Sequence, residues 1–118
     1  MNKDSIIEIL NKKEKVISTI LVKNGKTKNL SKNAKALLNS VDIRISAGST
    51  IGNVLKIQVG KTTATTVIQS GSVVGDNVTI KSGAKIGRNV SIGAGLTVGD
   101  RAIITKGSSL PSLLDLMS

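Results

Sequence analysis

The sequence has no cysteine, no histidine, no aromatic residue and only one proline in its 118 residues. Without cysteine, the chain can form neither a disulfide nor a thiolate metal site. Without aromatic side chains, it lacks stacking platforms for bases and sugar rings, which disfavours binding of single-stranded nucleic acid and of carbohydrate. No apolar run approaches membrane-spanning length and no secretory signal is visible, so we expect synthesis in the cytoplasm and no membrane partner.

Lysine dominates the charged residues, and the formal net charge is +10. Residues 1–40 hold nine lysines against three acidic residues, which concentrates positive charge in this segment. The segment is either a solvated polar face or a basic docking arm for an acidic protein partner or a larger assembly. The candidate partner-binding residues are Lys12, Lys13, Lys15, Lys23, Lys26 and Lys28. Nucleic acid would be another acidic partner, but the sequence carries no recognised nucleic-acid-binding motif.

An aliphatic residue recurs at every sixth position in the second half of the chain. The eight positions are Ile68, Val74, Ile80, Ile86, Ile92, Val98, Ile104 and Leu110. A period of six matches neither the 3.6 residues of a helix nor the two of a free strand. It indicates one short strand and one corner per repeat, with the chain wound into a coil.

The corner positions support the same period. Three places after the aliphatic positions come Gly71, Asn77, Gly83, Asn89, Gly95, Arg101 and Gly107. Glycine and asparagine tolerate the left-handed backbone of a tight corner, whereas Arg101 would be mildly strained there. The pattern extends back to Ile45, with a register slip between Ile57 and Ile68. That slip is either an irregular coil or a small loop at one corner.

Hexads such as VGDNVT, IGRNVS, IGAGLT and VGDRAI resemble the hexapeptide-repeat family over about residues 45–110. The resemblance implies an all-β solenoid, a left-handed parallel β-helix of about four coils. Stacked coils would lie about 4.8 Å apart. On this template Val74 pairs with Ile92, and Ile86 lies buried between Ile68 and Ile104.

Many members of this family are acyltransferases that use a histidine as general base, and related hydratases bind zinc through histidines. Neither site can be transferred to a chain without histidine. Asp42, Asp76, Asp100 and Asp115 are single carboxylates, and Asp76 and Asp100 fall at corners, where aspartate is an ordinary turn residue. We therefore expect no enzyme activity, no catalytic residue, no cofactor and no metal site.

Composition divides the chain into a basic appendage (residues 1–40), the repeats (residues 41–110) and an apolar C-terminal cap (residues 111–118). Residues 5–8 have capping-box spacing, and apolar residues follow at helix-like intervals to Leu21, which predicts a helix. A hairpin is the alternative, because residues 16–22 are rich in β-branched side chains and Asn24-Gly25 is a turn dipeptide.

Two further short helices are expected. Ser31 is a candidate N-cap for a helix that continues to Asn39. Pro111 can start a helix carrying Leu113, Leu114, Leu116 and Met117. This apolar tail would cover the last coil or, alternatively, dock into a neighbouring molecule.

The leading hypothesis is a non-catalytic structural protein, an oligomeric β-helix module that docks on a larger complex. The family often trimerises through flat sides, so a homotrimer is expected. A virion part, such as a capsid decoration or fibre-base protein, would suit a compact basic chain without aromatics. The alternatives are a transferase-like protein, degenerate or a non-catalytic subunit, and a basic nucleic-acid-associated protein. Small neutral residues expected to face solvent on the flat sides are Ser72, Thr79, Ser91, Ala94 and Thr97.

Overall fold

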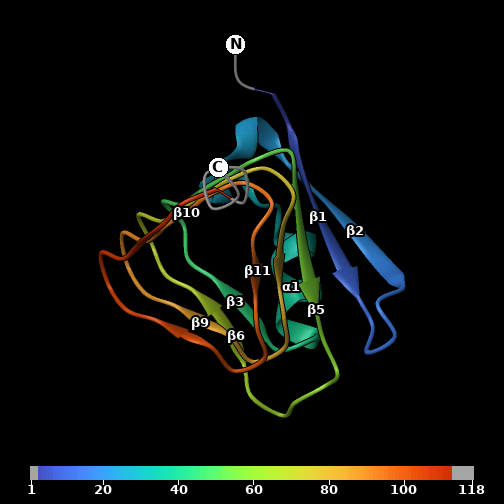
Figure 1. Ribbon diagram of the computed structural model, residues 1–118. Coiled ribbons are helices and arrows are strands. Elements are labelled where there is room, and N and C mark those ends of the chain that lie inside the picture. The colour runs from blue at the N-terminus through green and yellow to red at the C-terminus, as the bar shows by residue number, and fades with distance from the viewer. Residues whose placement is uncertain (1–2, 113–118) are drawn as a thin grey trace.

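The computed structural model describes residues 3–112, which form a mostly β molecule with parallel sheets and one α-helix (Figure 1). Sheet A contains, in spatial order, β11 (Thr97–Val98), β8 (Val78–Ile80), β5 (Val54–Gln58), β1 (Ser5–Leu10) and β2 (Val16–Val22). Sheet B contains β13 (Ser109–Leu110), β10 (Ser91–Ile92), β7 (Val73–Val74) and β4 (Thr50–Ile51). Sheet C contains β12 (Ile103–Ile104), β9 (Lys85–Ile86), β6 (Thr66–Ile68) and β3 (Ile43–Ile45).

From β3 onward the chain visits sheets C, B and A in turn, as expected of a β-helix (Figure 1). Val74 pairs with Ile92 in parallel, and Ile86 pairs with both Ile68 and Ile104. These pairs confirm the predicted spacing of 18 residues. The side chain of Ile86 is fully buried, so the aliphatic residues of successive turns stack into one core.

The register slip predicted before Ile68 is a loop at one corner. Ile57 pairs with Ile80, which is 23 positions later, whereas Ile80 pairs with Val98 after 18. The five extra residues fall between β5 and β6. Of the two alternatives left open by the sequence, the corner loop is therefore correct.

The predicted corners adopt the left-handed backbone. Asn77, Asn89 and Arg101 each have a φ of 55°. The corner glycine Gly71 has a φ of 79°, and a Cβ added to it would collide with Oδ1 of Asn89. Glycine is thus needed at position 71 both for the corner and for the close approach of the next coil.

The helix predicted over residues 5–21 is wrong, because this segment forms the antiparallel hairpin β1–β2. The turn does not lie at Asn24-Gly25 as the hairpin alternative assumed. It lies at residues 11–15, where Oδ1 of Asn11 accepts hydrogen bonds from the main-chain N–H groups of Lys13 and Lys15 at 2.9 and 3.0 Å.

Long-range pairing explains why the hairpin forms instead of a helix. Strand β1 pairs in parallel with β5, which places Ile7 beside Leu55 and Ile9 beside Ile57 in the core. The β-branched residues of both strands suit this sheet, and its tertiary contacts override the local helix-like spacing.

The second predicted helix is confirmed as α1 (Lys32–Ser40). The Ser31 hydroxyl accepts a hydrogen bond from the N–H of Ala34 at 3.1 Å and so caps the helix. Leu38 packs in the same core cluster as Ile43 of β3. Helix α1 thus covers the core at the first strand of sheet C.

Two 3₁₀ turns, η1 (Lys23–Gly25) and η2 (Thr27–Asn29), cover the edge of β4. The main-chain N–H of Thr27 donates to the carbonyl of Ser49 at 3.0 Å, and the Ser5 hydroxyl donates to the carbonyl of Ile51 at 2.9 Å. Contacts of this kind blunt an edge that would otherwise pair with another chain.

Pro111 and Ser112 are not helical, and the rest of the predicted C-terminal cap lies outside the described residues. Half-buried Leu96, Ala102, Ile104 and Leu110 pack on the core at this end. Within residues 3–112, the helix present is too short and too polar to span a membrane.

Burial of the stacked aliphatic residues should dominate stability. We expect Ile86→Ala to lower the free energy of unfolding by about 2–5 kcal/mol, because it leaves a cavity in the core. Ile103→Ala is the matched control, since this isoleucine is 73% exposed and should change stability by less than about 0.5 kcal/mol. Urea denaturation followed by circular dichroism measures both. Equal effects would contradict the stacking register.

The corner at Asn89 should reject a β-branched side chain. We expect Asn89→Val to cost about 1–3 kcal/mol, because valine is strained at a φ of 55°. Asn89→Gly should leave the midpoint of thermal unfolding nearly unchanged, since glycine adopts this φ freely. A valine variant that melts like the wild type would show that the corner is not left-handed.

Candidate docking surface

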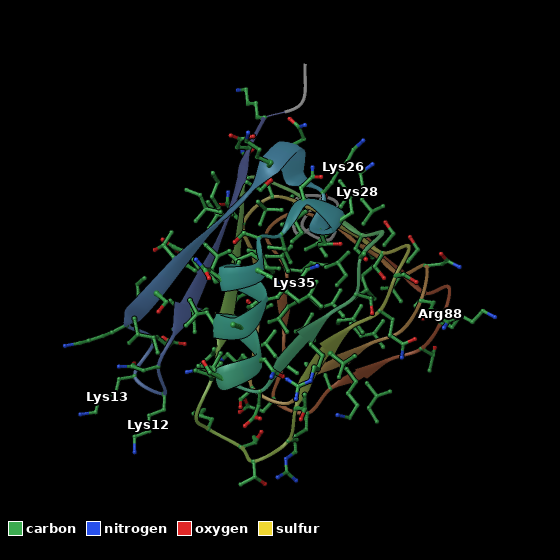
Figure 2. All side chains as sticks on the ribbon, turned by 180° about the vertical axis from the view of Figure 1, so that it is seen from behind. Lys12, Lys13, Lys26, Lys28, Lys35 and Arg88 are labelled. Carbon is green, nitrogen blue, oxygen red and sulfur yellow. The ribbon has the colours of Figure 1, made fainter. Side chains whose placement is uncertain are left out.

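The six lysines predicted to bind a partner form two groups at the two ends of β2. Lys12, Lys13 and Lys15 lie in and after the hairpin turn, whereas Lys23, Lys26 and Lys28 lie in and beside η1 and η2. Figure 2 shows Lys12 and Lys13 at one end of the blue hairpin and Lys26 and Lys28 at the other. The structure therefore does not bring the six lysines together in one patch.

Hydrogen bonds hold both lysine groups in place. At the hairpin turn, Nε2 of the buried Gln58 donates to the carbonyls of Asn11 and Lys12 at 3.4 and 3.2 Å. At the other end, Oδ1 of Asp4 accepts from the N–H of Asn24 at 3.0 Å. The lysine side chains thus extend from ordered main chain, which limits the entropy lost when a partner binds.

Between the two lysine groups, β2 is an edge strand of sheet A. Its seven residues include no charged residue and no proline, the usual devices that protect an edge. A bulge opposite Ile9 and Leu10 disturbs only its first residues. Val16, Ile17 and Leu21 are 50%, 52% and 57% exposed. This strand therefore combines an unprotected edge with exposed apolar side chains.

A hollow of about 420 Å³ separates β2 from α1. The two elements lie on the same face of the molecule (Figure 2, where β2 is blue and α1 is teal). The lining residues are Thr19, Ile20, Leu21, Lys23, Asn29, Ser31, Asn33, Ala34 and Leu37. One wall is thus an edge strand and the other is a helix, and no acidic residue of the described part of the chain (residues 3–112) lines the hollow.

Further basic residues, which the sequence analysis did not single out, lie over sheet C. Lys85, Arg88 and Lys106 line a hollow of about 350 Å³ beside the exposed Ile103. Arg88 and Lys106 are 18 positions apart and so occupy equivalent corners of successive turns. That spacing could have identified this pair from the sequence. Arg88 lies on the opposite side of the view from Lys12 and Lys13 (Figure 2).

Residues 65–100 match a family model described as bacterial transferase hexapeptide (six repeats). The predicted resemblance to the hexapeptide-repeat family is confirmed over these residues. The match begins beside β6 and ends just after β11, where the register of 18 holds throughout. No curated protein and no solved structure matches the chain.

The corner carboxylates Asp76 and Asp100 lie in turns, as predicted, and each contacts a residue of an earlier part of the chain. Oδ1 of Asp76 accepts a hydrogen bond from the N–H of Asn53 at 2.7 Å, and Oδ2 of Asp100 lies 4.0 Å from Nζ of Lys61. Within residues 3–112, acidic side chains form no cluster of three that could hold a metal ion. Asp115 lies outside the described residues.

The outer face of sheet B differs from the other two hexapeptide faces. Paired outward positions across its four strands hold Thr50, Val73, Ser91 and Ser109. The residues that follow the inward positions of β4, β7 and β10 are Gly52, Gly75 and Gly93. None of these outward positions is charged, whereas sheet C carries Arg44 and Lys85 and sheet A carries Glu8 and Lys56.

Of the five small neutral residues expected to face solvent, Ser91, Ala94 and Thr97 are exposed and Thr79 is half-buried, whereas the prediction for Ser72 is wrong. Ser72 does not face solvent, because it is fully buried and its hydroxyl donates to the carbonyl of Gly87 at 2.9 Å. Thr79 and Thr97 pair with each other on sheet A, whereas Ser91 lies on sheet B. The small neutral residues therefore do not share one face, and sheet B is the uncharged one.

Proposed function

We propose that this protein is a non-catalytic assembly module, a homo-oligomer that docks on a larger complex through its N-terminal segment. The observation that carries the proposal is the outer face of sheet B, which presents no charged outward residue in a chain of net charge +10. Charge is depleted at the centre of protein interfaces, and small side chains let flat faces approach closely.

The fold that presents this face is, in our proposal, a left-handed parallel β-helix of about four coils. Support comes from the parallel pairing of every third strand and from the spacing of 18 residues. Three sheets would then form the three sides of a prism. Because the three sides differ, the uncharged side at sheet B would serve self-association, and the other sides would remain free to bind partner proteins.

The homo-oligomer is proposed to be a trimer packed through sheet B, since hexapeptide-repeat proteins often trimerise. A mass of about three times 12.2 kDa is expected in solution. Ser91→Arg places a charge in the middle of the uncharged face and should dissociate the oligomer. Thr97→Arg makes the same change on sheet A and should leave the mass unaltered.

Light scattering with refractive-index detection is the suitable measurement, because a chain without aromatic residues barely absorbs at 280 nm. A wild-type protein that stays monomeric at micromolar concentration would contradict the homo-oligomer. Dissociation by Thr97→Arg but not by Ser91→Arg would move the interface from sheet B to sheet A.

The absence of catalysis is tested separately. The chain has no histidine to act as general base, and Asp76 and Asp100 are engaged by Asn53 and Lys61. We expect no release of coenzyme A above background when the pure protein is mixed with acetyl-coenzyme A and small alcohol or amine acceptors. Robust acetyl transfer would instead support the transferase alternative.

The larger complex would be an assembly that presents an acidic protein surface to the basic N-terminal segment. A virion, in which the module would be a capsid decoration or a fibre-base protein, is one such assembly. This setting stays a prediction. Nucleic acid would be a different partner, and binding to DNA that weakens steeply with salt would identify it.

A further inference from the structure

The main-chain groups of β2 alternate between its partner strand and the open groove. The N–H of Ile6 donates to the carbonyl of Asn53, and the carbonyl of Leu10 accepts from Val59, so these residues of β1 face β5. The alternate residue Ile7 therefore faces β2, where it pairs with Ile20.

It follows that Ile20 directs its main-chain N–H and carbonyl toward β1, while its neighbours Thr19 and Leu21 direct theirs the other way. Within residues 3–112, β2 pairs with β1 alone. Thr19 and Leu21 both line the hollow that separates β2 from α1. Two residues of an edge strand thus offer hydrogen-bonding groups at the mouth of this groove.

The opposite wall supplies side-chain contacts. Ala34 and the half-buried Leu37 of α1 line the groove facing Thr19 and Leu21. A groove between an edge strand and a helix suits an extended peptide, which adds as a strand through main-chain hydrogen bonds and places alternate side chains in the groove. Apolar side chains fit the wall that Ala34 and Leu37 form.

The lysines at the two ends of β2 indicate which charge the ends of a bound peptide would carry. Lys15 precedes β2 and Lys23 follows it, and Lys12 and Lys26 reinforce the two ends. Acidic residues lie nearby as well: Glu8 on β1 pairs with Thr19, Glu14 lies in the hairpin turn, and Asp4 lies beside Asn24. Lysines nevertheless outnumber acidic residues at both ends of β2. Positive charge at both ends and an uncharged strand between them complement a segment that is apolar in its middle and acidic at its ends.

Self-pairing of β2 fits this charge pattern poorly. In an antiparallel pair of two copies centred on Thr19, Lys15 of one copy would lie opposite Lys23 of the other at both ends. Like charges directly opposite each other destabilise a strand pair. A partner segment of opposite charge avoids this repulsion.

We propose that the groove between β2 and α1 binds an extended, acidic-ended segment of a partner protein, which adds to sheet A as a further strand. The inference rests on the proposed docking function and goes beyond it by naming the groove, the binding mode and the chemistry of the partner. It does not depend on the oligomer interface at sheet B.

The probe is a random peptide library displayed on phage and selected on the intact wild-type protein. We expect selected peptides to have an apolar middle and acidic residues at the ends. Their affinity is then measured by isothermal titration calorimetry with synthetic copies. Thr19→Pro removes the outward N–H and should weaken binding about tenfold or more, which corresponds to about 1.4 kcal/mol.

Thr19→Val is the matched control, because valine keeps both the N–H and the β-branched shape, and it should bind like the wild type. Proline is tolerated where an edge strand faces solvent, and thermal unfolding followed by circular dichroism checks that the variant folds. A second pair of variants is independent of the strand. Lys15→Glu with Lys23→Glu should weaken binding, whereas Arg88→Glu with Lys106→Glu makes the same change in net charge over sheet C and should not.

The other possible results of these binding experiments would contradict the proposed peptide groove. Failure to select any peptide, or selected peptides that bind Thr19→Pro and the Lys15/Lys23 variant as well as the wild type, would exclude the groove. A lower oligomer mass for Thr19→Pro would show that a second copy occupies it. These results would leave the proposed assembly function intact, whereas acetyl transfer would overturn that function without changing peptide binding.

Discussion

Parallel stacking of strands, at a spacing of 18 residues from β6 onward, is the constraint on which this molecule depends. The stack brings Ile68, Ile86 and Ile104 together and repeats for the other two sheets. It requires a corner of fixed geometry in every hexad, which explains the left-handed residues at Asn77, Asn89 and Arg101. A core built in this way fills with aliphatic side chains and needs no aromatic residue. Outward positions are left free to differ from face to face.

A stack of this kind has ends, and its first strands expose unpaired edges. The N-terminal segment covers the first strands of sheets B and C but extends sheet A. At sheets B and C, the 3₁₀ turns and α1 cover the first strands, as the bond from Thr27 to Ser49 illustrates. At sheet A, the hairpin extends the sheet and moves the edge from β5 to β2. The groove beside α1 is a consequence of this difference.

Much of the repeat region could be predicted from the sequence, because a hexad places its inward residue and its corner within six positions. The pairing of Val74 with Ile92 follows from that period together with the three strands per coil that the resemblance to the hexapeptide-repeat family implies. The hairpin could not be predicted in the same way. Its apolar residues fit helical spacing locally, and the partner that favours a strand, β5, lies more than forty residues away.

Only part of the candidate docking site could be predicted from the sequence. Composition identified Lys12, Lys15 and Lys23 as basic residues of the N-terminal segment, but their separation by a free edge strand depends on the hairpin. The groove joins β2 to α1, and no local pattern reports that contact. By contrast, the basic pair Arg88 and Lys106 follows from the same spacing of 18, but composition does not point to it because positive charge is densest in residues 1–40.

Hydrogen exchange tests most directly whether β2 is the docking edge of an assembly module. Exchange of the Thr19 and Leu21 amides is measured in the isolated protein and in its native assembly, with the Ile20 amide as an internal reference. We expect the Thr19 and Leu21 amides to exchange quickly in the isolated protein and slowly in the assembly, and the Ile20 amide to be protected in both. Thr19 and Leu21 amides that exchange equally fast in both states would contradict it.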